Sequence, residues 1–131
     1  AVTDVTTVEL DSAVIVLCSQ NPWSAKLFGN PKIESVIADA AELLPTLPDG
    51  RYSAIFHDPP TVKLAGELYG GEFYRQLFRV LKRGGRLFHY VGDLESPLGR
   101  SVSRGVTNRL AEAGFGRITR HVEAFGLVAT K

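Results

Sequence analysis

Three short apolar runs, each with an acidic residue at or next to its end, constrain the fold of this chain most strongly. They are Val5–Leu10, which carries Glu9 near its end, Ile33–Asp39 and Tyr52–Asp58. Runs that are rich in branched and aromatic side chains and bounded by turn formers are typical of strands. Because helical segments separate these strands, the pattern predicts an α/β fold on a largely parallel sheet.

The rest of the chain continues this alternation. The predicted helices cover 11–18, 40–44, 73–81 and 101–113, and the remaining predicted strands cover 86–91, 117–122 and 124–130. The helix over 73–81 has the clearest apolar face and is expected to end at Gly84-Gly85. Too little chain joins the last two strands for a helical crossover, so we expect them to form an antiparallel hairpin.

The composition favours one domain without a membrane segment. The chain has 131 residues, of which 44% are hydrophobic, enough for a single core. Its 15 basic and 14 acidic residues are dispersed and leave a net charge of +1, so no general attraction to nucleic acid is predicted, although this average does not address a local patch. No apolar stretch approaches the roughly 20 residues that span a bilayer, and a cytoplasmic protein is expected.

Acidic residues at the ends of three predicted strands indicate a ligand site. Ligands of open parallel sheets bind just outside the carboxyl ends of the strands, where Glu9, Asp39 and Asp58 should lie. A carboxylate can accept two charge-assisted hydrogen bonds from a ribose diol. We therefore expect Glu9 to bind the ribose of a nucleoside and Asp39 to bind at its adenine end. The alternative for each acid is to cap the helix that follows it.

Several motifs in order resemble class I S-adenosylmethionine-dependent methyltransferases. They are Val8–Asp11, Ala38–Ala40, His57–Pro60 and Phe73–Gly85. The segments Asn21–Ser24, Leu64–Tyr69 and Leu87–Tyr90 add a resemblance to the predicted archaeal-type methyltransferase group. The resemblance spans Val5–Thr130 and implies a Rossmann-like sheet with S-adenosylmethionine as cofactor. The cofactor-binding residues that it implies are Glu9, Leu10, Asp39, Ala40, Asp58 and Pro59.

The residues at the ends of the later strands are candidates for chemistry and for substrate contact. His57 and Asp58 are the expected catalytic pair, because an imidazole titrates near neutral pH and can act as a general base. Pro60, His89 and Tyr90 are the expected substrate residues, and neighbouring strands would bring the two histidines together. The alternative is that both histidines pack beneath the loop and bind backbone groups. No third residue in register completes a metal site.

The methyl acceptor stays open at this point. Enzymes that methylate exocyclic amines of nucleobases carry an aromatic residue after Asp-Pro-Pro, and Thr61, which stands there, cannot stack on a base. A small molecule, a protein and a nucleic acid all remain candidate acceptors.

Two other functions compete with methyl transfer. Glu67–Tyr69, Glu72–Tyr74 and Gly84-Gly85 also resemble the spermidine synthase group, which transfers aminopropyl from decarboxylated S-adenosylmethionine. Lys63 in the loop after Pro60 would repel a polyamine, which favours methyl transfer. A non-catalytic scaffold of the same fold is the third reading.

The family's first strand and glycine-rich turn have no counterpart in this sequence. Without them, the strands ending at Glu9 and at Asp58 would keep exposed edges. We therefore expect residues 1–131 to form a single partial domain that is completed by an N-terminal segment or by a companion chain. Self-association into a homo-oligomer is a further alternative.

Overall fold

The computed structural model describes residues 2–131 and divides the chain into two compact units. The first unit ends at Leu43 and the second runs from Leu44 to Lys131. The prediction of a single domain stays a prediction.

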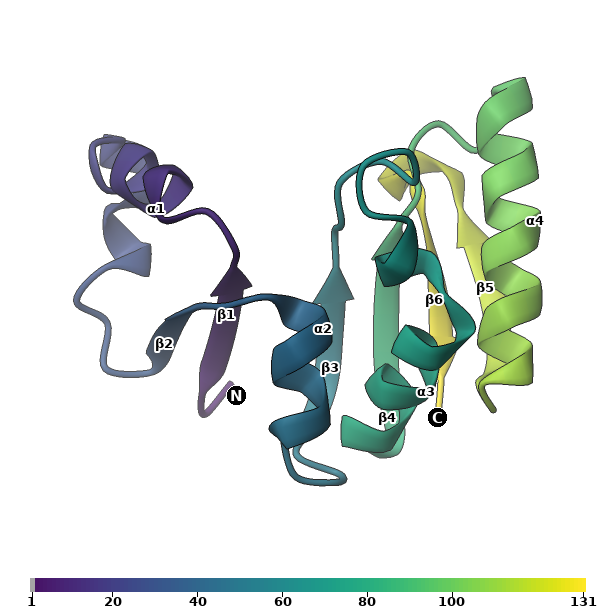
Figure 1. Cartoon of the computed structure of the whole chain (residues 1–131), viewed down its shortest axis with the longest axis horizontal. Helices are drawn as coiled ribbons and strands as arrows, with labels where there is room; N and C mark the ends of the chain where they lie inside the picture. The colour runs from purple at the N-terminus through teal and green to yellow at the C-terminus, as the bar shows by residue number, and fades with distance from the viewer. Residues whose placement is uncertain (1) are drawn as a thin grey trace. The chain divides into compact units, whose positions relative to one another are not determined.

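The first unit is built on two parallel strands (Figure 1). Its elements are β1 (Val5–Glu9), α1 (Ser12–Ser19), the 3₁₀ helix η1 (Pro22–Leu27), β2 (Ile33–Ile37) and α2 (Ala40–Leu43). Strand β1 pairs with β2 from Val5 opposite Ile33 to Glu9 opposite Ile37. The predicted cap of α1 is confirmed, because the Asp11 carboxylate accepts a 2.8 Å hydrogen bond from the backbone N–H of Ala13.

The second unit holds a four-stranded mixed sheet with the order β3-β4-β6-β5. Its strands are β3 (Tyr52–His57), β4 (Leu81–Tyr90), β5 (Gly116–His121) and β6 (Gly126–Thr130). Its helices are η2 (Leu44–Thr46), η3 (Gly66–Tyr69), α3 (Gly71–Val80), α4 (Pro97–Glu112) and η4 (Val122–Ala124). Strands β3 and β4 are parallel, whereas β6 is antiparallel to both of its neighbours. The predicted α/β class with a C-terminal antiparallel hairpin is confirmed.

The core of this unit lies between the sheet and the helices α3 and α4 (Figure 1). The buried residues of the helices include Phe73, Tyr74, Leu77, Val80, Val106 and Leu110, and those of the sheet include Leu87, Leu127 and Ala129. The predicted apolar face of the helix over 73–81 is therefore confirmed as core. None of the helices in the described part of the chain has the length and apolar character needed to cross a membrane.

Two element boundaries differ from the sequence prediction. Helix α3 ends at Val80 and strand β4 begins at once, so Gly84 and Gly85 lie inside the strand rather than at a helix end. The reason is pairing with the C-terminus: the N–H of Gly84 donates to the carbonyl of Lys131, whose N–H donates to the carbonyl of Gly85, both at 2.9 Å. Gly84 adopts a φ of 73°, which favours glycine.

Helix α4 starts four residues earlier than predicted, at Pro97 instead of Ser101. Ser96 caps it by accepting a 3.0 Å hydrogen bond from the N–H of Gly99. Proline is favourable in the first turn of a helix, where its missing N–H leaves no bond unmade.

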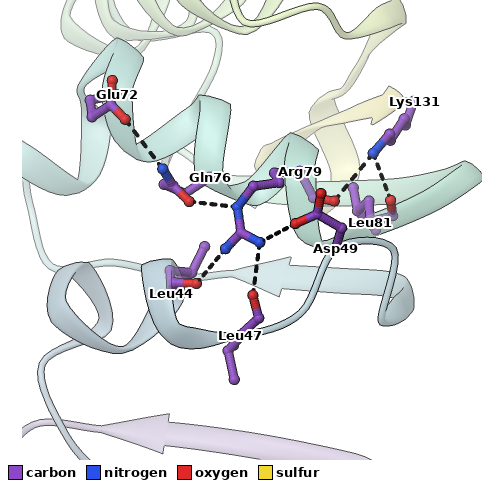
Figure 2. Close-up of polar contacts among 8 residues, drawn as sticks. All are labelled: Leu44, Leu47, Asp49, Glu72, Gln76, Arg79, Leu81 and Lys131. Atoms are coloured by element: carbon purple, nitrogen blue, oxygen red, sulfur yellow. Dashed lines mark hydrogen bonds and ion pairs between the residues drawn. The ribbon is translucent and has the colours of Figure 1, made fainter.

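Arg79 ties the chain before β3 to helix α3 (Figure 2). Its guanidinium donates 2.8 Å hydrogen bonds to the carbonyls of Leu44 and Leu47 and to the side chain of Gln76, and it pairs with Asp49. Arg79 is thus a charged donor to two backbone carbonyls of this segment, of which the Leu44 carbonyl also accepts from the N–H of Leu47.

Replacing Arg79 by methionine should lower the free energy of unfolding by about 2–3 kcal/mol, because the carbonyls lose a charged donor. The matched control is Arg75→Met, since the Arg75 guanidinium pairs with the Glu72 carboxylate on the exposed face of the same helix, and its loss should cost less than about 0.5 kcal/mol. Urea denaturation measures both. Equal losses in the two variants would contradict the assigned role of Arg79.

Candidate functional site

The two acids of the first unit lie at the carboxyl ends of its parallel strands. Glu9 is the last residue of β1 and stands opposite Ile37 in the register, and Asp39 follows two residues after Ile37. Both side chains belong to half-buried residues. The structure therefore brings Glu9 and Asp39 to the same end of the strand pair. Asp58 belongs to the second unit, so the common edge of all three acids stays a prediction.

Both carboxylates hold local backbone groups and keep acceptor capacity. Glu9 Oε1 accepts a 2.9 Å hydrogen bond from the N–H of Asp11, and Asp39 Oδ1 accepts a 2.8 Å bond from the N–H of Ala41 at the start of α2. Asp39 thus fills the helix-capping role considered as the alternative. A carboxylate has about four lone-pair sites, so each acid can still accept from a diol or an amino group. Leu10 is 68% exposed beside Glu9, and Ala40 is half-buried beside Asp39.

Two histidines meet at the carboxyl ends of β3 and β4 in the second unit. His57 and His89 are opposite each other in the parallel register. Their ring centroids lie 4.5 Å apart in an edge-on arrangement. The predicted approach of these two side chains is confirmed.

Hydrogen bonds fix the tautomers of both rings. His89 Nδ1 lies 2.8 Å from the carbonyl oxygen of Tyr90, which can only accept, so Nδ1 carries the proton. His89 Nε2 then accepts from the Tyr74 hydroxyl at 2.9 Å. His57 Nε2 donates to the carbonyl of Leu68 at 2.9 Å.

Burial keeps this cluster uncharged at neutral pH. Burial, reinforced by the positive charge that His57 can carry, lowers the pKa of His89 to about 3. Burial also lowers the pKa of His57, against smaller opposing effects of the Leu68 carbonyl and Asp58. The pKa values of the Tyr69 and Tyr74 hydroxyls are raised, mainly by burial. The site therefore offers neutral donors and acceptors beside the exposed carboxylate of Asp58.

Three side chains tie the loop after β3 to the packed body of the unit. His57 binds the Leu68 carbonyl, the Tyr69 hydroxyl donates to the Pro60 carbonyl at 3.0 Å, and Arg109 Nε of α4 donates to the Tyr69 carbonyl at 2.7 Å. The loop thus begins and ends on fixed contacts. Asp58 and Pro60 are exposed on it, and Pro59 is half-buried.

Burial changes the role expected for His89. Its side chain is fully buried and both ring nitrogens are used within the protein, so it packs against His57 and Tyr69 and has no free nitrogen for a substrate. Tyr90 is 40% exposed and remains available for contact. The backbone hydrogen bonds of both histidines match the packed alternative. Among residues 2–131, no group of three histidine, cysteine or acidic side chains is arranged to hold a metal ion.

Sequence reasoning missed Tyr69, Tyr74 and Arg109 as parts of this site. Tyr74 lies within the apolar helix predicted over 73–81, and its buried hydroxyl needs a partner that the helical pattern does not identify. Arg109 reaches a carbonyl 40 residues away in sequence, a partner that periodicity does not reveal.

The buried His89 should make stability depend on pH. Its pKa is lower in the folded state than the usual 6.5 of the unfolded chain, so its contribution is fully present above about pH 6.5 and is lost as the pH falls toward 3. Over that range this one proton lowers the free energy of unfolding by about 1.4 kcal/mol per pH unit. His89→Gln should show a shallower dependence by that amount in urea denaturation at several pH values. Parallel curves for the two proteins would contradict a buried neutral His89.

Comparisons with known proteins show the family to which the chain belongs. The family model of the spermine/spermidine synthase domain matches residues 1–113. An uncharacterized protein of Methanocaldococcus jannaschii is 43% identical over 130 residues, which are 98% of this chain and 44% of that protein. These matches do not support the closer resemblance to the predicted archaeal-type methyltransferase group.

Solved structures agree on the fold. A spermidine synthase in complex with the transition-state analogue AdoDATO superposes with a TM-score of 0.84 at 20% identity, over 98% of this chain and 47% of that one. A putative S-adenosyl-L-methionine-dependent methyltransferase from Methanococcus maripaludis gives a TM-score of 0.63 at 18% identity, over 96% of this chain and 66% of that one. The fold is thus the Rossmann-like one shared by methyltransferases and spermidine synthases.

The chain spans less than half the length of the M. jannaschii relative and of the spermidine synthase. The family model nevertheless covers most of its residues, from the first strand to the end of α4. This chain belongs to the spermine/spermidine synthase domain family.

Proposed function

We propose that the chain is part of a transferase that uses S-adenosylmethionine and transfers its methyl group. The observation that carries this proposal is the pair Glu9 and Asp39 at the carboxyl ends of two parallel strands, with free acceptor capacity on each. Glu9 with Leu10 would hold the ribose, and Asp39 with Ala40 would hold the adenine. When bound, the cofactor supplies a methyl group on a sulfonium, which is already a good leaving group.

The residues at the end of β3 are suited to a reaction whose rate depends on how the methyl donor and the acceptor are oriented. Methyl transfer from a sulfonium to a good nucleophile needs little acid-base help, so orientation can supply most of the rate. Asp58 and Pro59 would line the methyl-donor pocket, and Pro60 and Tyr90 would face the acceptor. His57 Nε2 donates to the Leu68 carbonyl, which leaves Nδ1 free to accept a proton from the molecule that receives the methyl group.

Aminopropyl transfer is the second candidate, because the family model is that of spermine and spermidine synthases. A polyamine is a polycation and needs several carboxylates along its path. The loop between Asp58 and Gly70 carries only Asp58 and Glu67 against Lys63, and the strand end contributes the uncharged His57. This charge pattern favours an acceptor that is not a polycation.

Calorimetry of the intact protein tests the assignment. S-adenosylmethionine and S-adenosylhomocysteine should both bind, and more tightly than decarboxylated S-adenosylmethionine. Glu9→Gln should weaken binding about 10- to 100-fold, since it removes a charge-assisted acceptor of the ribose. Glu34→Gln, the same change at an exposed position of β2, is the matched control and should leave binding unchanged.

The contrary results separate the rival functions. Preference for decarboxylated S-adenosylmethionine would replace methyl transfer by aminopropyl transfer. If none of the three nucleosides gives detectable heat, both transferase functions would be contradicted, and the non-catalytic scaffold would be the function that is supported.

The exposed edge of β3 supports a further part of the proposal, that another strand completes this sheet. Among the described residues β4 is the one strand that pairs with β3, and Phe56 on β3 is 81% exposed. Open strand edges and apolar sheet faces are normally covered. We assign the covering strand to an N-terminal segment of the protein or to a companion chain.

Native mass spectrometry tests this pairing. The cofactor-binding species should be heavier than residues 1–131 alone, and a species of twice their mass would identify a second copy as the companion. A folded, cofactor-binding species with the mass of residues 1–131 alone would contradict it.

A further inference from the structure

A basic groove lies on the second unit, on the side formed by α4 and β5. It encloses about 310 Å³ and is lined by Arg100, Ser103, Arg104, Thr107, Asn108 and Arg120. Arg120 comes from β5 and the other five residues come from α4. None of these residues belongs to the histidine site at the ends of β3 and β4.

The arginines of the groove hold free donors. Among residues 2–131, the side chains of Arg104 and Asn108 have no hydrogen-bond or ion-pair partner. Arg100 donates from one nitrogen to the Glu95 carbonyl, and Arg120 donates to the Leu94 carbonyl at 3.0 Å. A guanidinium has five N–H groups, so these contacts orient Arg100 and Arg120 without exhausting them.

Few acids oppose this positive charge. Between Pro97 and His121 the sequence has five arginines, no lysine, and Glu112 as its one acid. Glu95 lies 3.5 Å from Arg120 and offsets part of that charge at an exposed position. The chain as a whole is nearly neutral, so the groove concentrates positive charge that the net value conceals.

The residue types favour a phosphate ligand. Arginine presents a planar fork that matches the oxygens of phosphate, and asparagine also commonly contacts phosphate oxygens. The hydroxyls of Ser103 and Thr107 donate to helix carbonyls, at 3.2 and 2.8 Å, so the arginines and Asn108 supply the donors. The lining contains no aromatic residue on which a base could stack and no apolar residue that could insert into a membrane.

The shape of the groove favours a ligand that runs along the surface. Arg100, Arg104, Asn108 and Arg120 are all exposed, whereas small-molecule sites enclose most of their ligand. Arg100 and Arg104 are four residues apart on the helix, which places them about 6 Å apart along its axis. A ligand with several phosphates in a row can contact both.

We propose that the α4–β5 groove binds phosphate oxyanions, with a polynucleotide backbone as their source. The binding is to phosphates and not to base edges, so it is expected to be insensitive to sequence. This proposal does not rest on the proposed methyl transfer, because the groove and its test require no cofactor.

Fluorescence anisotropy of the intact protein with a fluorescein-labelled oligonucleotide, single-stranded and duplex, tests the proposal across a range of salt concentrations. Arg104→Gln should weaken binding about fivefold near physiological salt and lower the slope of log K against log salt by about 1, the loss of one phosphate contact. Within the described residues 2–131 the Arg104 side chain makes no hydrogen bond or ion pair, so its replacement should leave stability unchanged. Arg75→Gln, an exposed arginine on α3, is the matched control and should keep full affinity.

Two further arms distinguish the source of the phosphate. Inorganic phosphate that binds without the oligonucleotide, and that Arg104→Gln weakens, would support the groove with a small phosphate ester as ligand. Equal losses for Arg104→Gln and Arg75→Gln, or no loss for either, would overturn the proposal. Binding to vesicles of phosphatidylserine and phosphatidylcholine in equal parts that is as tight as binding to the oligonucleotide would also overturn the proposal, in favour of a membrane surface.

Discussion

The imidazole of His89 links the sheet of the second unit to the helix that covers it. Strand β4 is an inner strand of the four, and His89 is fully buried near its end. A buried polar group without a partner costs about 1–3 kcal/mol, so both ring nitrogens must be satisfied. The Tyr74 hydroxyl of α3 and the Tyr90 carbonyl satisfy them, and this requirement fixes where α3 sits on the strand.

The same cluster organises the loop that would face a substrate. His57 lies against His89 and holds the Leu68 carbonyl, while Tyr69 holds the Pro60 carbonyl. His57 and Tyr69 thus hold the loop through uncharged groups, and Arg109 adds a charged donor at the Tyr69 carbonyl. A positively charged cofactor is repelled by a histidine cation but not by a neutral imidazole. The lowered pKa values of both histidines are therefore compatible with the proposed methyl transfer, in which a sulfonium would lie near this strand end.

The fold, and the residues that it brings together at the strand ends, could be predicted from the sequence. Both depend on the periodicity of apolar residues and on the order of strands and helices along the chain. Alternating strands and helices predicted the parallel pairing, and that pairing placed His57 beside His89 and brought Glu9 and Asp39 to one strand end. Hydrogen-bond partners could not be read in this way. Periodicity places Tyr74 and Arg109 on helices but does not give their hydrogen-bond partners, which follow only from the tertiary arrangement. In the α4–β5 groove, likewise, Arg120 of β5 joins Arg100 and Arg104 of α4 only when the two elements pack together.

The cluster at the ends of β3 and β4 depends on a neutral His89 that carries its proton on Nδ1. Nitrogen-15 chemical shifts of the histidine rings in the intact protein, followed from neutral to acidic pH, measure both properties directly. We expect the Nδ1–H tautomer for His89 and no protonation of its ring until the pH nears 3 or the protein unfolds. Protonation of His89 near pH 6.5 in the folded protein, or the opposite tautomer, would contradict it.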